Sequence, residues 1–157
     1  MHQTQLLQRL AQLEAKNEIG NLIGQYAVAA DQGNNPQIMA QLFHEDACWQ
    51  AKGFGAYQGR TQITQALHEI AEQQVRWSLH VMAQPFIEVA DDAQSATAQW
   101  VLWELAHLQH AEHSADHWLG GVYHSQLRPD QSGKWRFSQV QLELKMNTAY
   151  PAGFEKL

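Results

Sequence analysis

The N-terminal part of the chain carries apolar residues at the three- and four-residue spacing of a helix that buries one side. The stripe consists of Leu6, Leu7, Leu10 and Leu13, followed after a polar interruption by Ile19, Leu22, Ile23, Tyr26 and Ala30. We predict one helix over residues 4–32, because Gly33 suits a C-cap and Pro36 can open a new helix. The same spacing predicts a short helix over residues 36–43 and a third over residues 61–74.

The remaining chain alternates between apolar and polar residues, the period of half-buried strands. Strands are predicted over residues 46–52, 77–89, 95–107, 118–127 and 134–146. The glycine-rich residues 53–59 and the histidine-rich residues 108–117 are predicted loops, and residues 129–133 a hairpin turn. Helices followed by an antiparallel meander predict a single α+β domain over residues 1–157. Its core spans about residues 15–147, with an N-terminal helical extension and a short C-terminal tail.

Composition narrows the classes of partner. The formal net charge of −6 argues against nucleic acid or an anionic membrane as the main partner. Cys48 is the single cysteine, so the chain forms no internal disulfide and no cysteine-rich zinc site. No apolar run approaches the ~20 residues of a membrane span, and the N-terminus lacks a signal-peptide pattern. We therefore expect a soluble, cytoplasmic protein.

Asp31 and His80 are the candidates for proton transfer. Asp31 ends the first predicted helix, where a carboxylate costs about 0.3–1 kcal/mol against the helix dipole. Strand alternation places His80 on the face of Ser78, Met82, Gln84 and Phe86, opposite Val81, Ala83, Ile87 and Val89. A carboxylate bonded to an imidazole fixes its tautomer and raises its basicity. The residues alone also allow a solvated aspartate and a core histidine.

Aromatic residues are the candidates for ligand contact. Trp49, Phe54 and Tyr57 are candidate mouth residues of a pocket, with a pure core role equally open. Tyr123 and His124 point to opposite faces, and we favour Tyr123 as the one that faces the cavity. Trp100 and Trp103 also point to opposite faces, and an aromatic outer face predicts a homodimer packed through the sheet.

Four histidines resemble a metal cluster by spacing: His107, His110, His113 and His117. No fixed carboxylate pattern accompanies them, and zinc sites are usually better organised. We interpret them as solvated loop histidines and expect no physiological metal.

A longer series of motifs resembles one family. Tyr26-x4-Asp31 is followed by Leu42-Phe43-His44-Glu45-Asp46-Ala47, Tyr57-Gln58-Gly59-Arg60, Leu79-His80, Gly120-Gly121-Val122-Tyr123-His124 and Gly133-Lys134-Trp135-Arg136-Phe137. This order resembles the SnoaL-like branch of the NTF2-like superfamily over roughly residues 15–147. The resemblance implies a cone in which a curved, mostly antiparallel sheet wraps around helices and encloses a deep pocket. Similar proteins include scytalone dehydratase, bile-acid 7α-dehydratase, polyketide cyclases and ketosteroid isomerase, as well as non-catalytic association subunits.

The resemblance implies roles for three residues: His80 as the base, Asp31 as its partner and Tyr26 as a donor to substrate oxygen. It implies a small lyase or isomerase of dehydratase type that needs no metal or organic cofactor. Its substrate would be an apolar, cyclic hydroxy-carbonyl molecule. The chain departs from scytalone dehydratase in having no histidine on residues 98–104 of the next strand, and the arginine late in the sheet of the bile-acid enzyme is assigned to no residue here. The alternative is a binding or association module without chemistry.

Overall fold

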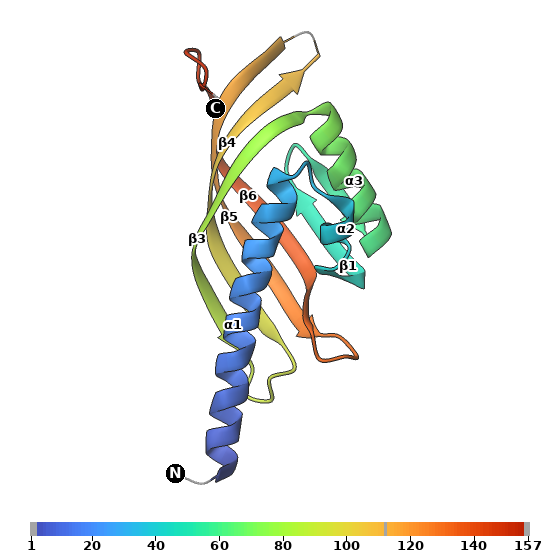
Figure 1. Cartoon of the computed structure of the whole chain (residues 1–157), viewed down its shortest axis with the longest axis vertical. Helices are drawn as coiled ribbons and strands as arrows, with labels where there is room; N and C mark the ends of the chain where they lie inside the picture. Colours follow the sequence, from blue (N-terminus) through green and yellow to red (C-terminus); the bar gives the residue numbers. More distant parts are fainter. Residues whose placement is uncertain (1–2, 112, 156–157) are drawn as a thin grey trace.

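The computed structural model describes residues 3–111 and 113–155. Three helices pack on a six-stranded sheet (Figure 1). The elements are α1 (Gln3–Asp31), α2 (Pro36–Met39), β1 (Phe43–Ala51), β2 (Gly55–Gln58), α3 (Arg60–Gln73), β3 (Val75–Val89), β4 (Ala96–His110), β5 (His113–Pro129) and β6 (Trp135–Ala149). The predicted order of helices and strands is therefore present in the described residues.

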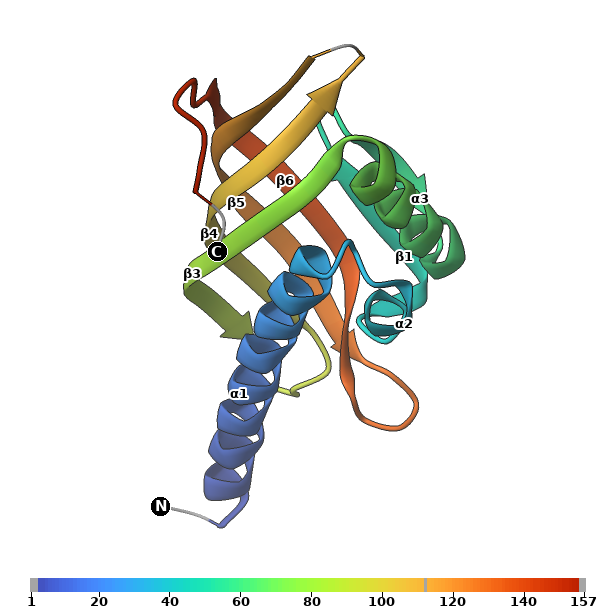
Figure 2. The same cartoon turned by 45° about the horizontal axis from the view of Figure 1, so that its top comes forward.

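The sheet has the order β2-β1-β6-β5-β4-β3. Its strand pairs are antiparallel except for β1 and β6, which run parallel. The long strands curve, and α1 lies against one face of the sheet while α3 lies beside β1 (Figure 2). The core fills the space between this face and the helices.

Helix α1 is buried along its second half only. The buried residues run from Ala15 to Ala30, whereas Leu6, Leu7, Leu10 and Leu13 are 49–64% exposed. The N-terminal turns project beyond the sheet (Figure 1), where Gln8 and Gln12 hydrogen-bond Asp91 in the turn between β3 and β4. These four exposed leucines therefore contribute to no hydrophobic core among the described residues.

Several element boundaries differ from the prediction. Helix α2 ends at Met39 instead of residue 43, because Phe43 is fully buried as the first residue of β1. The glycine-rich segment contains the short edge strand β2, paired with β1. The predicted loop over residues 108–117 is wrong as well, since β4 continues to His110 and β5 begins at His113.

A bulge in β3 corrects the predicted strand faces. Gln84 has a positive φ of 53°, Pro85 has no N–H to donate, and the pairing with β4 shifts register between Ala83 and Phe86. Phe86 consequently points away from the core and is 65% exposed, while Ile87 and Val89 pack against the core. The face of His80 is therefore shared with Ser78 and Met82 but not with Phe86.

Strand β4 alternates regularly and presents one acid to the interior. Trp100 is 1% exposed and Trp103 is 40% exposed, so the predicted opposite faces of these residues are confirmed. Glu104 falls on the buried face with Trp100 and Leu102 and is 6% exposed.

Among the described helices, none combines the length and apolar character needed to cross a membrane.

Candidate active site

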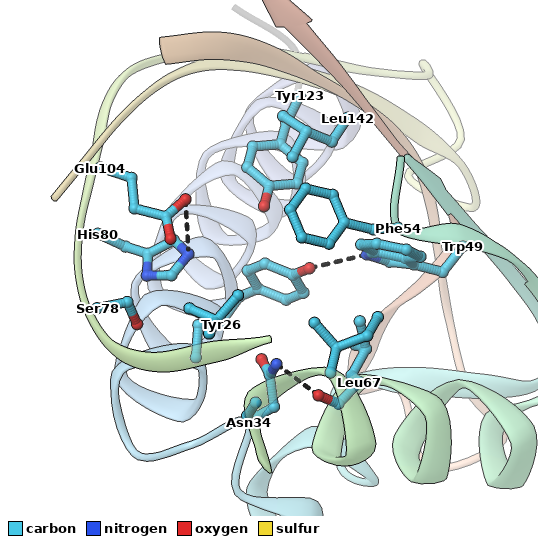
Figure 3. A pocket seen from close by; sticks show the side chains of 14 residues that line it. Tyr26, Asn34, Trp49, Phe54, Leu67, Ser78, His80, Glu104, Tyr123 and Leu142 are labelled. Atoms are coloured by element: carbon cyan, nitrogen blue, oxygen red, sulfur yellow. Dashed lines mark hydrogen bonds and ion pairs between the residues drawn. The ribbon is translucent and has the colours of Figure 1, made fainter. Parts of the chain in front are cut away.

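A cavity lies where the C-terminal end of α1, helix α3 and the first half of β3 meet (Figure 3). The residues that line it are Tyr26, Ala30, Asn34, Trp49, Phe54, Leu67, Ile70, Ala71, Val75, Ser78, His80, Glu104, Tyr123 and Leu142. Its volume is about 60 Å³, enough for a few water molecules. Pockets for drug-sized ligands span roughly 300–1,000 Å³. The cavity as it stands suits a small ligand.

Asp31 and His80 are in direct contact. Oδ1 of Asp31 lies 2.6 Å from Nδ1 of His80, and the Asp31 carboxylate also accepts the His80 backbone N–H and the Ser78 hydroxyl. An ionised carboxylate only accepts, so Nδ1 carries the hydrogen and Nε2 is the nitrogen left for a ligand. Asp31 does not line the cavity itself and holds His80 from behind. The catalytic role of the pair stays a prediction.

Glu104 is a third ionisable residue at this site. It pairs with His80 across β3 and β4, and its Oε2 lies 3.5 Å from His80 Nε2. Sequence reasoning missed Glu104. The signal was present, because a lone acid on the apolar face of an alternating strand must be buried.

The two carboxylates change the titration of His80. Burial alone would lower the pKa of His80, but the charge of Glu104, the hydrogen bond that His80 donates to Asp31 and the charge of Asp31 raise it above the ordinary 6.5. Burial raises the pKa of Glu104, and so does the Asp31 carboxylate, while the His80 cation opposes both. His80 and Glu104 therefore both retain their protons to a higher pH than isolated groups would.

Tyr26 is fixed by a neighbouring indole. Nε1 of Trp49 donates to the Tyr26 hydroxyl at 2.8 Å, which leaves the hydroxyl hydrogen of Tyr26 available to a ligand oxygen. Burial raises the pKa of Tyr26 to about 12, against opposing interactions with Trp49 and Tyr123. Tyr26 is therefore a neutral hydrogen-bond donor throughout the physiological range.

The predicted ligand-contact residues fall into two groups. Trp49, Phe54 and Tyr123 line the cavity (Figure 3), and Tyr123 is the member of the Tyr123–His124 pair that faces inward. Tyr57 lies outside the lining, where it stacks on Trp49 at 5.9 Å and donates to the Phe54 carbonyl at 2.7 Å. Tyr57 thus supports two lining residues, and its contact with a ligand stays a prediction.

Among the described residues, the ionisable side chains of the lining besides tyrosines are His80 and Glu104, and it includes no lysine or arginine. The walls are otherwise aromatic or aliphatic. A carboxylate, phosphate or other anionic group would meet Glu104 without a permanent cation to balance it. The electrostatics favour a neutral ligand.

The four histidines predicted to lie in a loop sit on β4 and β5. His107 bonds Asp116 through Nδ1 at 2.8 Å, and His117 bonds Asn147 through Nδ1 at 2.7 Å. Within residues 3–111 and 113–155, no three histidine, cysteine, aspartate or glutamate side chains are grouped to hold a metal ion.

Comparisons with known proteins agree with this architecture. The family model described as the SnoaL-like domain matches residues 11–141. No curated protein sequence gives a significant match.

Solved structures with the same fold cover nearly the whole chain. LinA-type3 hexachlorocyclohexane dehydrochlorinase from Novosphingobium barchaimii has a TM-score of 0.82 at 19% identity, covering 95% of this chain and 98% of that chain. A scytalone dehydratase-like protein from Novosphingobium aromaticivorans has a TM-score of 0.75 at 22% identity, covering 89% and 90%. An NTF2-like protein with a cystatin-like fold from the same species has a TM-score of 0.71 at 23% identity, covering 92% and 90%. These TM-scores establish a shared fold, and at identities below 25% they establish the fold alone. The predicted NTF2-like α+β class is confirmed.

Proposed function

Because the chain belongs to the SnoaL-like family, we propose that it is a cofactor-independent lyase or isomerase of dehydratase type. The observation that carries the proposal is the 2.6 Å contact between Asp31 Oδ1 and His80 Nδ1 at the wall of a buried cavity. Two structurally similar proteins carry the names of elimination enzymes, a dehydrochlorinase and a dehydratase. The substrate is a small, neutral, cyclic hydroxy-carbonyl compound.

Each residue has one task in this reaction. Nε2 of His80 removes a proton from the carbon next to the carbonyl, and Asp31 stabilises the imidazolium that forms. The Tyr26 hydroxyl, positioned by Trp49, donates to the oxygen that becomes the enolate. Loss of the hydroxyl then gives a dehydration, and reprotonation at another carbon gives an isomerisation.

Turnover of defined probes tests the proposal. Racemic 3-hydroxycyclohexanone is incubated with the protein and cyclohexenone is followed by its absorbance, while 3-chlorocyclohexanone, which differs only in its leaving group, is followed by chloride release. We expect His80→Ala to lower turnover by about 10²–10⁴-fold. His113→Ala, on an exposed histidine at the start of β5, serves as the control. Equal turnover in wild type and His80→Ala would remove His80 from the mechanism.

One observation favours a second function, that of a binding module without chemistry. Aromatic side chains occupy much of the space that a ligand would need, among them Tyr26, Trp49, Phe54 and Tyr123. Under this alternative the wild type binds cyclic ketones, detected by quenching of tryptophan fluorescence, but converts none of the probes.

We also propose that two copies associate through the outer face of the sheet. Leu79 and Val81 on β3 and Val101 and Trp103 on β4 are 40–49% exposed and lie on adjacent strands. Exposed apolar groups of this kind typically mark an interaction surface. Sedimentation should show a dimer that Val81→Lys with Val101→Glu dissociates, whereas Leu10→Gln with Leu13→Gln in the projecting part of α1 leaves it intact. A monomeric wild type would contradict the association.

A further inference from the structure

Glu104 faces the same nitrogen that the proposed base would use. The two residues are paired in register across β3 and β4, with Oε2 of Glu104 3.5 Å from Nε2 of His80. Both side chains line the cavity from one wall (Figure 3). Glu104 is 6% exposed, and none of the described lysines and arginines lines the cavity to neutralise it.

This geometry lets Glu104 and His80 share a proton. In one arrangement Nε2 is protonated and Glu104 is a carboxylate, and in the other Nε2 is bare and Glu104 is a neutral acid. Both arrangements carry the same total charge and differ by one short transfer between neighbouring atoms. Because Asp31 occupies Nδ1, the exchange involves Nε2. A buried carboxyl kept neutral can act as a proton donor near neutral pH.

Resting on the proposed function, we propose that Glu104 is the general acid of a dehydration in which His80 is the base. His80 Nε2 takes the proton from the carbon next to the carbonyl, and the electron pair of that C–H bond forms the new double bond by way of the enolate. The C–O bond of the neighbouring carbon breaks, and its oxygen takes the Glu104 proton and leaves as water. The proton on Nε2 then passes to the Glu104 carboxylate, which restores both groups without a solvent proton.

Two consequences separate this role from a structural one. First, base and acid lie on one wall, so the hydrogen and the hydroxyl leave from the same face of the ring. Second, a leaving hydroxide needs a proton, whereas a chloride leaves as a stable anion. Glu104 is therefore required for loss of water but not for loss of hydrogen chloride, while His80 is required for both.

The test uses the two probes on wild type and Glu104→Gln. We expect Glu104→Gln to lower dehydration of 3-hydroxycyclohexanone by about 10²-fold or more and to leave chloride release from 3-chlorocyclohexanone within about threefold. Glu143→Gln is the matched control, because Glu143 pairs with His124 at 3.8 Å on the exposed face. Unchanged dehydration in Glu104→Gln, or an equal loss of both activities, overturns the proposal. If Glu104→Gln does not fold, Glu104→Asp keeps the acid and should retain partial dehydration.

Stereochemistry gives an independent readout. 3-Hydroxycyclohexanone with deuterium at C2 cis to the hydroxyl should lose the deuterium on conversion to cyclohexenone, and the trans isomer should retain it. Loss of deuterium from the trans isomer would show that acid and base do not act on the same face of the ring.

A third measurement needs no turnover. Nitrogen-15 NMR of the His80 ring should show a lower titration midpoint in Glu104→Gln than in wild type, because an attracting charge is lost. An unchanged midpoint overturns the shared proton. The wild type could be inactive on both probes while Glu104→Gln still lowers the titration midpoint of His80. That result would contradict the proposed function and the acid step, but it would support the shared proton.

Discussion

Oδ1 of Asp31 lies 2.6 Å from Nδ1 of His80, although 49 positions separate the two residues in the chain. Asp31 is the last residue of α1, and from this end of the helix its side chain reaches β3. The backbone N–H of His80 donates to both oxygens of the same carboxylate, at 3.0 and 3.1 Å. This arrangement fixes the orientation of the imidazole before any ligand binds.

Asp31→Asn should remove that orientation. An amide carries no charge to stabilise the imidazolium, and its NH2 group places a donor opposite the His80 backbone N–H where Oδ2 now accepts. We expect turnover to fall by about 10²–10⁴-fold and the free energy of unfolding to fall by about 1–3 kcal/mol. Urea unfolding and the probe assays measure both effects. Asp92→Asn, in the exposed β3–β4 turn, is the control, and full activity of Asp31→Asn would contradict the positioning role.

The sequence supports some of these features and leaves others open for physical reasons. Residue type and strand phase predict Asp31 and His80 as candidates, but their contact depends on how α1 crosses the sheet. Strand alternation alone could have predicted that Glu104 is buried, but only the register of β3 against β4 places it opposite His80. The outward turn of Phe86 could not follow from a period of two, because the bulge at Gln84 changes the phase. Local periodicity thus predicts faces, and long-range register decides which faces meet.

Tyr26→Phe and Tyr57→Phe should distinguish a hydroxyl that contacts the substrate from one that only supports the cavity wall. Each change removes one hydroxyl: that of Tyr26 accepts from Trp49 Nε1 at 2.8 Å, and that of Tyr57 donates to the Phe54 carbonyl at 2.7 Å. Tyr26→Phe takes the donor from the cavity, so we expect turnover of 3-hydroxycyclohexanone to fall by about 10-fold or more. Tyr57→Phe should retain turnover within about threefold. Steady-state kinetics measure the difference, and equal effects would argue against an enolate contact by Tyr26.

Phe54→Ala should widen the range of ligands. Phe54 projects into the cavity from the turn between β1 and β2 and is half-buried (Figure 3). Removing its ring enlarges a cavity of about 60 Å³, so a two-ring hydroxy-ketone should bind more tightly relative to 3-hydroxycyclohexanone. The ratio of kcat/KM for the two probes measures this change. A ratio that stays at the wild-type value would show that Phe54 does not limit ligand size.

The stability of the fold should depend on pH through His80 and Glu104. Both have a pKa raised in the folded state, so the folded protein binds more protons than the unfolded chain. The stabilisation from His80 is fully present below the ordinary pKa of 6.5 and is lost as pH rises through its folded pKa. Melting temperatures between about pH 5 and pH 9 should fall for wild type and fall less for Glu104→Gln. Parallel curves for the two proteins would contradict the coupling, and Glu143→Gln should follow the wild type.

A second histidine–aspartate pair gives the sharpest comparison with the proposed dyad. His107 Nδ1 lies 2.8 Å from Asp116 Oδ1, but neither residue lines the cavity. Asp116 instead accepts the backbone N–H of Phe154 at 2.6 Å, and Phe154 stacks on Tyr150 in the C-terminal tail. Asp116→Asn should therefore loosen the tail and lower the free energy of unfolding by about 1–3 kcal/mol while turnover stays within about threefold.

Limited proteolysis of the tail, together with the probe assays, measures this result. Asp31→Asn and Asp116→Asn make the same chemical change in two similar pairs, so a general effect of breaking a histidine–aspartate contact would lower turnover in both. Loss of turnover in Asp31→Asn alone would instead assign the chemistry to the pair whose second imidazole nitrogen faces a cavity.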